Sequence, residues 1–250
     1  MKNYTVIDTE MVFDRYLDEA YRSIDKRCDR TRVGARRLTM VALLDIGIDD
    51  LGKITVGKLR SWTTEQQGEG AMLQAVFHDL RQCADNPLVS YGGQAMDMKV
   101  IELAAMSYDL SLPPQLVQSF GPRRAEQSHL DLGSVMKGYG KTWHHLSELL
   151  LRLGFPVALL RDKANPDLPF RTGNWQLGRE HCELDTLLTA IAFVAWKKIQ
   201  GSPCVHIPEA TYALIEGYLR QRPDAIAAPI LRREQEQLLA GITARLQQAA

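Results

Sequence analysis

The chain has 250 residues, 45% of them hydrophobic, which is enough to bury a sizeable core in one domain or in one domain with an appendage. Its 30 basic and 30 acidic residues give a formal net charge of zero, so no global field attracts nucleic acid or an anionic membrane. Any polyanion must therefore be bound by local basic patches.

Four cysteines, Cys28, Cys83, Cys182 and Cys204, stand far apart and form no C-x-x-C pair. This spacing argues against a disulfide framework or a zinc ribbon and favours free thiols in a reducing compartment. The first residues lack the pattern of a secretory signal. The longest apolar run, LLTAIAFVAW, is shorter than the roughly 18 residues of a membrane span. We expect a soluble, cytoplasmic protein without membrane contact.

The first third of the chain predicts strands. Residues 3–13 are rich in β-branched and aromatic side chains and predict a strand, whereas the basic segment 25–37 predicts a loop. The runs 36–48 and 53–62, separated by the turn residues DDLG, predict two further strands. Three successive strands indicate an antiparallel start to the sheet.

Helical periodicity dominates the rest of the sequence. Apolar residues at helical spacing predict a helix over 68–83, and NPLVSYGG predicts a short strand closed by glycines, which gives the order β-β-β-α-β. Further helices are predicted over 94–110, 143–156, 182–203, 207–224 and 228–248.

Two acids, Asp8 and Glu10, stand in the first strand within VIDTE. Residues two apart on a strand share a face, so both carboxylates point to one side and repel each other. A cation relieves this repulsion, and Mg²⁺ and Mn²⁺ prefer such oxygen ligands. Taken alone, the pair is more simply explained by one acid facing solvent and the other capping a turn.

Two further acids accompany predicted helices. Asp97 follows a strand and the Gly92-Gly93 turn, whose glycines let a ligand approach the backbone closely, and lies in the first turn of a helix. Asp185 lies near the start of an otherwise apolar helix, where a carboxylate is costly to bury without a partner. Taken alone, Asp97 is also explained as a surface acid favoured by the helix dipole, and Asp185 as an exposed first-turn acid.

Taken in order, these motifs resemble the DEDD superfamily of 3′-5′ exonucleases, from about Asn3 to about Gly201. Within it, the chain is similar to the exonuclease domain of B-family DNA polymerases and its free-standing relatives. The matching motifs are VIDTE for the D-x-E strand, YGGQAMD for N-G-x-x-F-D, HLDL for H-x-D-L, and HCELD for Y-x-x-x-D.

This resemblance implies a ribonuclease H-like α/β fold, with a mixed sheet of three antiparallel strands followed by parallel strands, flanked by helices. We expect residues 1–202 to form the exonuclease domain and residues 203–250 to form a helical C-terminal extension.

The resemblance also implies two-metal hydrolysis of phosphodiester bonds with two Mg²⁺ or Mn²⁺ ions. The implied metal ligands are Asp8, Glu10, Asp97 and Asp185. Asp8 would bridge the ions, and His181 would orient or deprotonate the attacking water, because an imidazole exchanges protons near neutral pH. Contacts to nucleic acid are expected from Met11, Gly92 and Gly93.

The chain departs from the family motifs in two places. Gly92 replaces the motif Asn and Met96 its aromatic residue, which puts the contacts of those side chains to the terminal nucleotide in question. His181 replaces the motif Tyr. The branch of the superfamily that uses His places it one residue further from the acid, where this chain has Glu180.

Basic residues suggest two paths for a substrate. Segment 25–37 holds six basic residues against two acids and either guides a phosphate backbone or is simply solvated. A second basic and aromatic mixture suits single strands, although core packing explains Trp143 better. Its members are Arg123, Arg124, Lys137, Tyr139, Lys141 and Trp143.

Two other sets of residues are not assigned to the catalytic metal site. Asp131 in HLDL is expected to cap a strand-to-helix junction rather than to bind metal. A zinc site drawn from His144, His145, His181 or Cys182 has no supporting ligand spacing.

We expect a metal-dependent 3′-5′ exonuclease acting on DNA, with single-stranded ends preferred because the site must admit a frayed terminus. One alternative is a catalytically weak or inactive nucleic-acid-binding or polymerase-associated subunit, which the altered motifs favour and the four retained carboxylates oppose. The other is a 3′-5′ exoribonuclease, since the superfamily contains both. Nucleic acid is the expected partner, and the sequence does not identify a polymerase, repair or recombination partner.

Overall fold

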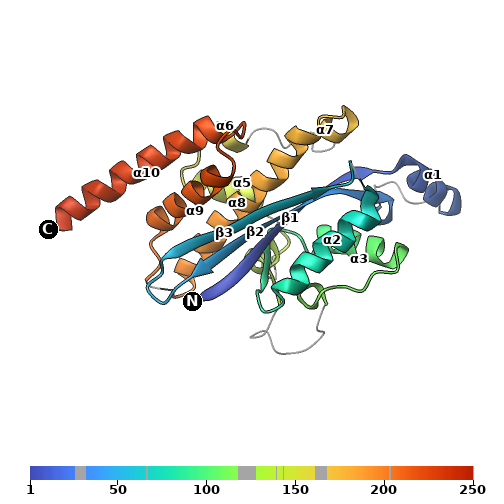
Figure 1. Ribbon diagram of the computed structural model, residues 1–250, viewed down its shortest axis with the longest axis horizontal. Coiled ribbons are helices and arrows are strands. Elements are labelled where there is room, and N and C mark those ends of the chain that lie inside the picture. The colour runs from blue at the N-terminus through green and yellow to red at the C-terminus, as the bar shows by residue number, and fades with distance from the viewer. Residues whose placement is uncertain are drawn as a thin grey trace.

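A five-stranded mixed sheet forms the centre of the protein (Figure 1). The computed structural model describes residues 1–25, 32–65, 67–117, 128–138, 140–142, 144–160, 168–202 and 204–249. The strand order is β3-β2-β1-β4-β5, in which β1 to β3 are antiparallel and β4 and β5 continue parallel to β1. This confirms the predicted fold class. The strands are β1 (Lys2–Phe13), β2 (Arg36–Ile48), β3 (Ile54–Thr63), β4 (Leu88–Ser90) and β5 (His129–Asp131).

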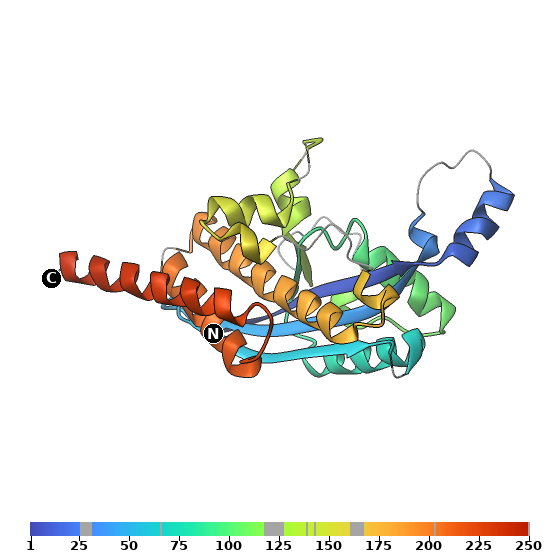
Figure 2. The same cartoon turned by 90° about the horizontal axis from the view of Figure 1, so that it is seen from above.

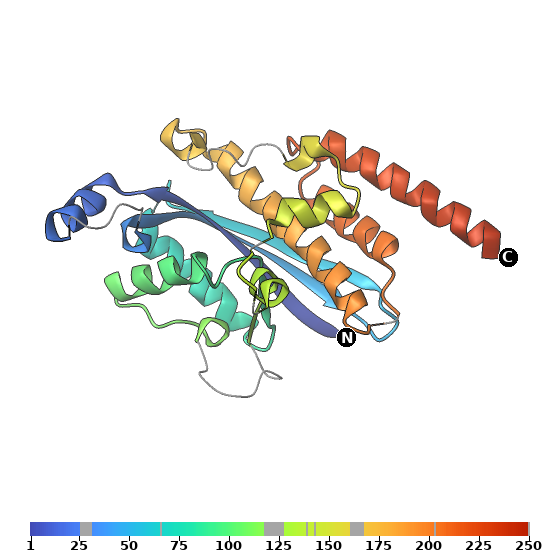
Figure 3. The ribbon, with the colours of Figure 1, turned by 180° about the vertical axis from the view of Figure 1, so that it is seen from behind.

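Helices cover both faces of the sheet, α2 and α3 on one and α8 with α5 and α9 on the other (Figures 2 and 3). Helices α1 and α10 project from opposite ends of the molecule (Figure 2). The helices are α1 (Arg15–Ile24), α2 (Gly68–Gln82), α3 (Asp97–Ser107), α4 (Leu132–Lys137), α5 (Leu146–Arg152), α6 (Val157–Leu160), α7 (Leu168–Arg171), α8 (Trp175–Ile199), α9 (Ile207–Gln221) and α10 (Ala228–Ala249), with 3₁₀ turns η1 (Val33–Ala35) and η2 (Pro114–Leu116).

Strand alternation places core side chains on both faces of the sheet. Along β1, Val6 packs into the cluster formed with α8 and α9, whereas Ile7 packs into the cluster formed with α2 and α3. Side chains on a strand alternate between faces, so Asp8 and Glu10 share the α8 face with Val6. The central strand therefore carries its acids toward the longest helix of the sheet-covering layers.

Helix α8 begins earlier than its apolar pattern predicts. The Asn174 side chain accepts a hydrogen bond of 3.2 Å from the backbone N–H of Leu177 and caps the helix, so α8 starts at Trp175. Asp185 consequently lies in the helix interior, and its predicted place near the helix start was wrong. An interior residue lies beyond the first turn, so the helix dipole does not explain the acid there.

Helix α1 was not predicted, although Asp14 caps it by accepting from the backbone N–H of Leu17 at 3.1 Å.

The predicted boundary between an exonuclease domain and a C-terminal extension lies just before α9. Leu214, Ile215 and Tyr218 of α9 are buried in the same core cluster as residues of α8. The division of the chain after residue 202 stays a prediction. Within the described ranges, every helix is too short or too polar to cross a membrane.

Candidate active site

The site lies where β1 continues past the end of its parallel neighbour. Strand β4 pairs with β1 only at Thr5 and Val6, so Asp8 and Glu10 lie beyond the paired segment. In α/β sheets the carboxyl ends of parallel strands border a crevice where ligands bind. A β-bulge between Glu10 and Met11 alters the register with β2 at the same place.

Helix α8 supplies the third acid. The buried Cys182 Sγ donates to the backbone oxygen of Asp8 at 3.4 Å, which fixes α8 against β1. About one turn further along the helix, Asp185 reaches the strand acids. One carboxylate oxygen from each of Asp8, Glu10 and Asp185 lies within 4.8 Å of the others. Among the described residues this is the one group of three or more acids, histidines or cysteines with that spacing.

Three partly buried carboxylates make this a strongly negative place. Burial and the charges of Asp8, Glu10 and Asp185 raise the pKa of the Cys182 thiol well above its usual value. The exclusively oxygen donor set is typical of a site for Mg²⁺ or Mn²⁺, and a neutral buried thiol adds no competing soft ligand. The residues present therefore fit a hard divalent cation.

Asp97 occupies the first position of α3, as predicted, but lies outside the three-acid group. Burial raises the pKa of Asp97 to about 7, and the charge of Asp131 adds to this, whereas the neighbouring Thr9 hydroxyl and the Arg36 guanidinium lower it. Thr9 separates Asp8 from Glu10 on β1. Asp97 thus lies beside the strand that carries the other acids.

The turn before Asp97 needs both of its glycines. Gly92 has a φ of +78°, a conformation that L side chains rarely adopt. A Cβ on Gly93 would lie 2.6 Å from Ser90 Oγ and 3.4 Å from Asp97 Oδ2. The two glycines therefore bring the turn close to Asp97, and their contact with nucleic acid stays a prediction.

Asp131 caps α4, as the sequence predicts, by accepting from the backbone N–H of Ser134 at 3.3 Å. It also accepts from the backbone N–H groups of Gly92 at 2.6 Å and Gln94 at 3.0 Å. This second role was not predicted, because the contact joins segments far apart in the sequence.

His181 stands one turn before Asp185 on α8 and lines a cavity bounded by α6, α8, α9 and the segment that leads into α10. In the described part of the chain, His144, His145, His181 and Cys182 are not gathered into a metal-binding group. Met11 packs at the edge of the core cluster of α2 and α3. The roles of His181 and Met11 stay predictions.

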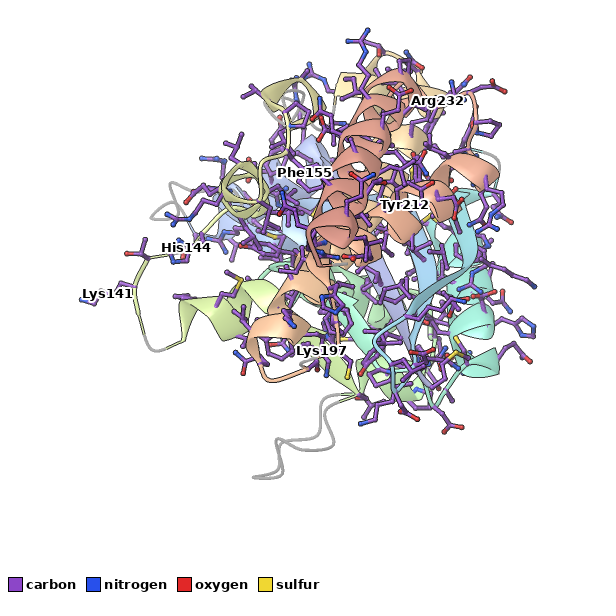
Figure 4. All side chains as sticks on the ribbon, turned by 90° about the vertical axis from the view of Figure 1, so that its left-hand side faces the viewer. Lys141, His144, Phe155, Lys197, Tyr212 and Arg232 are labelled. Atoms are coloured by element: carbon purple, nitrogen blue, oxygen red, sulfur yellow. The ribbon has the colours of Figure 1, made fainter. Side chains whose placement is uncertain are left out.

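Much of the predicted basic surface lies outside the described residues, namely 26–31, Arg123, Arg124, Tyr139 and Trp143. Lys137 is partly buried, and exposed Lys141 lies with His144 on a segment that projects from the body (Figure 4). Arg36, at the start of β2, is close enough to lower the pKa of Asp97. The sequence pattern placed Arg36 in the basic segment and at the start of a predicted strand, whereas its proximity to Asp97 depends on the fold.

Solved structures with similar folds include the family B DNA polymerase from the hyperthermophilic archaeon Pyrobaculum calidifontis, at 10% identity and a TM-score of 0.49. That alignment covers 88% of this chain and 29% of the polymerase. E. coli exonuclease I in complex with a 5cy-dT13 oligonucleotide is 13% identical with a TM-score of 0.43, over 82% of this chain and 42% of that one. The chain thus spans less than half the length of each. No curated protein matches the chain.

A family model does match, over residues 35–227. The matched residues include Asp97, His181 and Asp185. Asp8 and Glu10 precede the matched range. They reach Asp185 through the pairing of β1 with β2 and the packing of α8 on β1. The model describes a predicted 3′-5′ exonuclease related to the exonuclease domain of PolB, and this chain belongs to that family.

Proposed function

We propose that this chain is a metal-dependent 3′-5′ exonuclease that hydrolyses the terminal phosphodiester bond of DNA, with single-stranded ends preferred. The observation that carries the proposal is the meeting of Asp8 and Glu10 of β1 with Asp185 of α8, whose carboxylate oxygens lie within 4.8 Å of one another. Membership of a family related to the exonuclease domain of PolB supports the reaction class and favours DNA.

Four acids would hold the metal ions. Asp8, Glu10 and Asp185 would bind one Mg²⁺ or Mn²⁺ ion, and Asp8 and Asp97 would bind a second. When bound, two such ions lower the pKa of water and neutralise charge on a phosphate. The acids are held by rigid elements, Asp8 and Glu10 by the central strand and Asp185 by the interior of α8. Such support maintains the geometry of a site.

The remaining candidates would handle the substrate. His181, one turn before Asp185, would orient the attacking water and accept its proton. Gly92, Gly93 and Met11 would contact the terminal nucleotide. A frayed single-stranded end fits this arrangement because the acids lie partly buried between a strand and a helix. We place this chemistry within residues 1–202.

Digestion of a 5′-labelled single-stranded DNA and the matching RNA, with Mg²⁺, Mn²⁺ or EDTA, tests the proposal. We expect a metal-dependent ladder shortening from the 3′ end of the DNA, absent with Asp8→Ala. Asp50→Ala is the matched control, because Asp50 is an exposed acid at the far end of the sheet. Full activity of Asp8→Ala would overturn the metal mechanism, and faster RNA digestion would overturn the DNA preference. Binding of the DNA or RNA without cleavage in the presence of either metal would overturn the proposal that the chain is a nuclease.

A further inference from the structure

Arg36 and Arg37 begin β2 side by side but differ in their partners. Arg37 is engaged by the fold, because its Nε lies 3.1 Å from Asp14 Oδ2 and its Nη1 lies 3.4 Å from Glu69 Oε2. Among the described residues, Arg36 forms no ion pair, and its buried Nε has no hydrogen-bond partner. The fold therefore holds one of the two cations and leaves the other without a bonded partner.

The unpartnered donor of Arg36 requires an explanation. A buried donor without an acceptor costs free energy, and such groups in folded proteins are rare. The Arg36 side chain is only partly buried, so a molecule in solvent can reach it. An acceptor supplied by a ligand would account for an arginine at this position.

Arg36 lies on the same face of the sheet as Met11. On β2, Leu38 pairs with Met11 of β1, and both side chains pack with the core cluster of α2 and α3. Residues two apart on a strand share a face, so Arg36 lies on the face of Leu38. Met11 is the residue to which we assign contact with the terminal nucleotide. Arg36 is thus on the side of the sheet where the proposed substrate would lie.

Helix α3 brings Asp97 to the same place. The helix packs against β2 and against η1, the turn that directly precedes Arg36. Figures 1 and 3 both show α3 alongside the end of the β1–β2 pair. Asp97 is the first residue of α3, and it is close enough to Arg36 for the guanidinium charge to lower the pKa of Asp97. A cation therefore lies next to an acid to which we assign a metal ion.

The chemistry of a guanidinium fits a phosphate group. Arginine remains charged, and its N–H donors form a planar fork that matches two phosphate oxygens. The acids of the site repel a phosphate, and a nearby cation offsets this repulsion. Because the net charge of the chain is zero, such local cations must attract the backbone of a nucleic acid.

We propose that Arg36 binds one of the last two backbone phosphates at the 3′ end of the substrate. The contact would read neither base nor sugar, and it would position the strand beside the acids. This inference rests on the proposed exonuclease function.

Binding of a short 5′-labelled single-stranded DNA in EDTA tests the contact without hydrolysis, by fluorescence anisotropy over a series of salt concentrations. Arg36→Met should weaken binding about tenfold or more, as expected for the loss of charge-assisted hydrogen bonds. It should also reduce the slope of log affinity against log salt by about 0.7, the value for one phosphate of a single strand. Arg36→Lys should retain the wild-type slope. Lys58→Met, at an exposed position of β3, is the control and should change neither quantity.

A modified DNA locates the contact. Replacing the last two phosphates by neutral methylphosphonates should weaken binding to the wild type, and should cost about tenfold less affinity with Arg36→Met, because the contact is already absent. Two methylphosphonates at the 5′ end control for the general loss of charge. Equal losses of affinity with wild type and Arg36→Met would overturn the inference.

Stability separates substrate binding from a structural role. In urea denaturation, Arg36→Met should be at least as stable as the wild type, because no bonded partner is lost. Arg37→Met, which breaks two ion pairs, should be less stable. A loss of stability in Arg36→Met as large as that in Arg37→Met would show that Arg36 serves the fold. That result, an unchanged DNA affinity or an unchanged salt slope would each overturn the inference.

The two proposals fail in distinguishable ways. If the chain digests DNA but Arg36→Met binds it like the wild type, the phosphate contact fails and the exonuclease proposal stands. If binding depends on Arg36 as expected but neither metal supports digestion, the exonuclease proposal fails and the phosphate contact remains.

Discussion

The Asp131 carboxylate at the end of β5 accepts a hydrogen bond of 2.6 Å from the backbone N–H of Gly92, in the turn after β4. The same side chain holds Gln94 of that turn and caps α4 through Ser134. It is 1% exposed. A single buried carboxylate thus joins two neighbouring strands at the point where the chain leads to Asp97.

Replacement of Asp131 by Ala should disrupt the site although every candidate metal ligand remains. The change leaves backbone N–H groups without their acceptor and removes a helix cap, so we expect a loss of about 2–4 kcal/mol in unfolding free energy. Exonuclease activity should fall at least about tenfold. Urea denaturation and the digestion assay measure both effects. Asp85→Ala, which changes an exposed acid, is the control, and wild-type stability of Asp131→Ala would contradict the role assigned to Asp131.

Metal binding should stabilise the fold through the three-acid group. At a Mn²⁺ concentration about 100 times its dissociation constant, we expect a gain of about 2.7 kcal/mol. Asp8→Asn and Asp185→Asn should lose this gain, and in EDTA they should be at least as stable as the wild type because one like charge is removed. Thermal denaturation with Mn²⁺ or EDTA measures the effect. An undiminished Mn²⁺ effect in both variants would exclude these acids as ligands, with Asp50→Asn as the control.

The Arg222–Glu183 pair should be essential for docking α9 on α8. Glu183 is 0% exposed and accepts from Arg222 Nε at 2.6 Å, from Arg222 Nη2 at 2.7 Å and from Ser61 Oγ of β3 at 2.6 Å. Arg222→Ala leaves a buried charge uncompensated and should cost about 3–5 kcal/mol of unfolding free energy.

The double variant Glu183→Leu with Arg222→Leu should recover most of that loss, since an apolar pair of similar size avoids burying charge. Urea denaturation of the single and double variants gives the coupling energy. Arg152→Ala, at an exposed position of α5, is the control. A single-variant cost below about 1 kcal/mol would show that the pair is not needed for docking.

His129 should make the fold sensitive to mild acid. Burial lowers the pKa of His129, against the smaller opposing effect of the Asp131 charge, and Nε2 lies 2.8 Å from Ser90 Oγ. The stability contributed by the neutral imidazole is fully present above the unfolded pKa of about 6.5. It is lost as the pH falls below that value toward the folded pKa, at up to about 1.4 kcal/mol per pH unit.

Urea denaturation at pH 7.5, 6.5 and 5.5 measures this dependence. His129→Gln removes the titrating group, so the difference in unfolding free energy between wild type and variant should narrow or reverse on acidification. Parallel pH profiles for the two proteins would show that His129 does not govern this dependence.

Local pattern by itself determined the central part of the fold. The alternation in β1 places Asp8 and Glu10 on one face, and apolar periodicity indicates the helices that cover the sheet. The start of α8 was misplaced because residues 175–181 are largely polar and include Gly178, so the cap at Asn174 was the only strong signal. Helix α1 was missed for a similar reason, as its cap precedes a polar segment.

Only the tertiary structure decided which side chains meet. It joins Asp185 of α8 to the acids of β1, ties Asp131 to the glycine turn, and brings Tyr218 of α9 to the cavity that His181 lines. These contacts link residues far apart in the chain, and the periodicity of one element specifies its buried face but not its partner. The identity of the acids is thus a property of the sequence, whereas their convergence follows from the packing of α8 across β1.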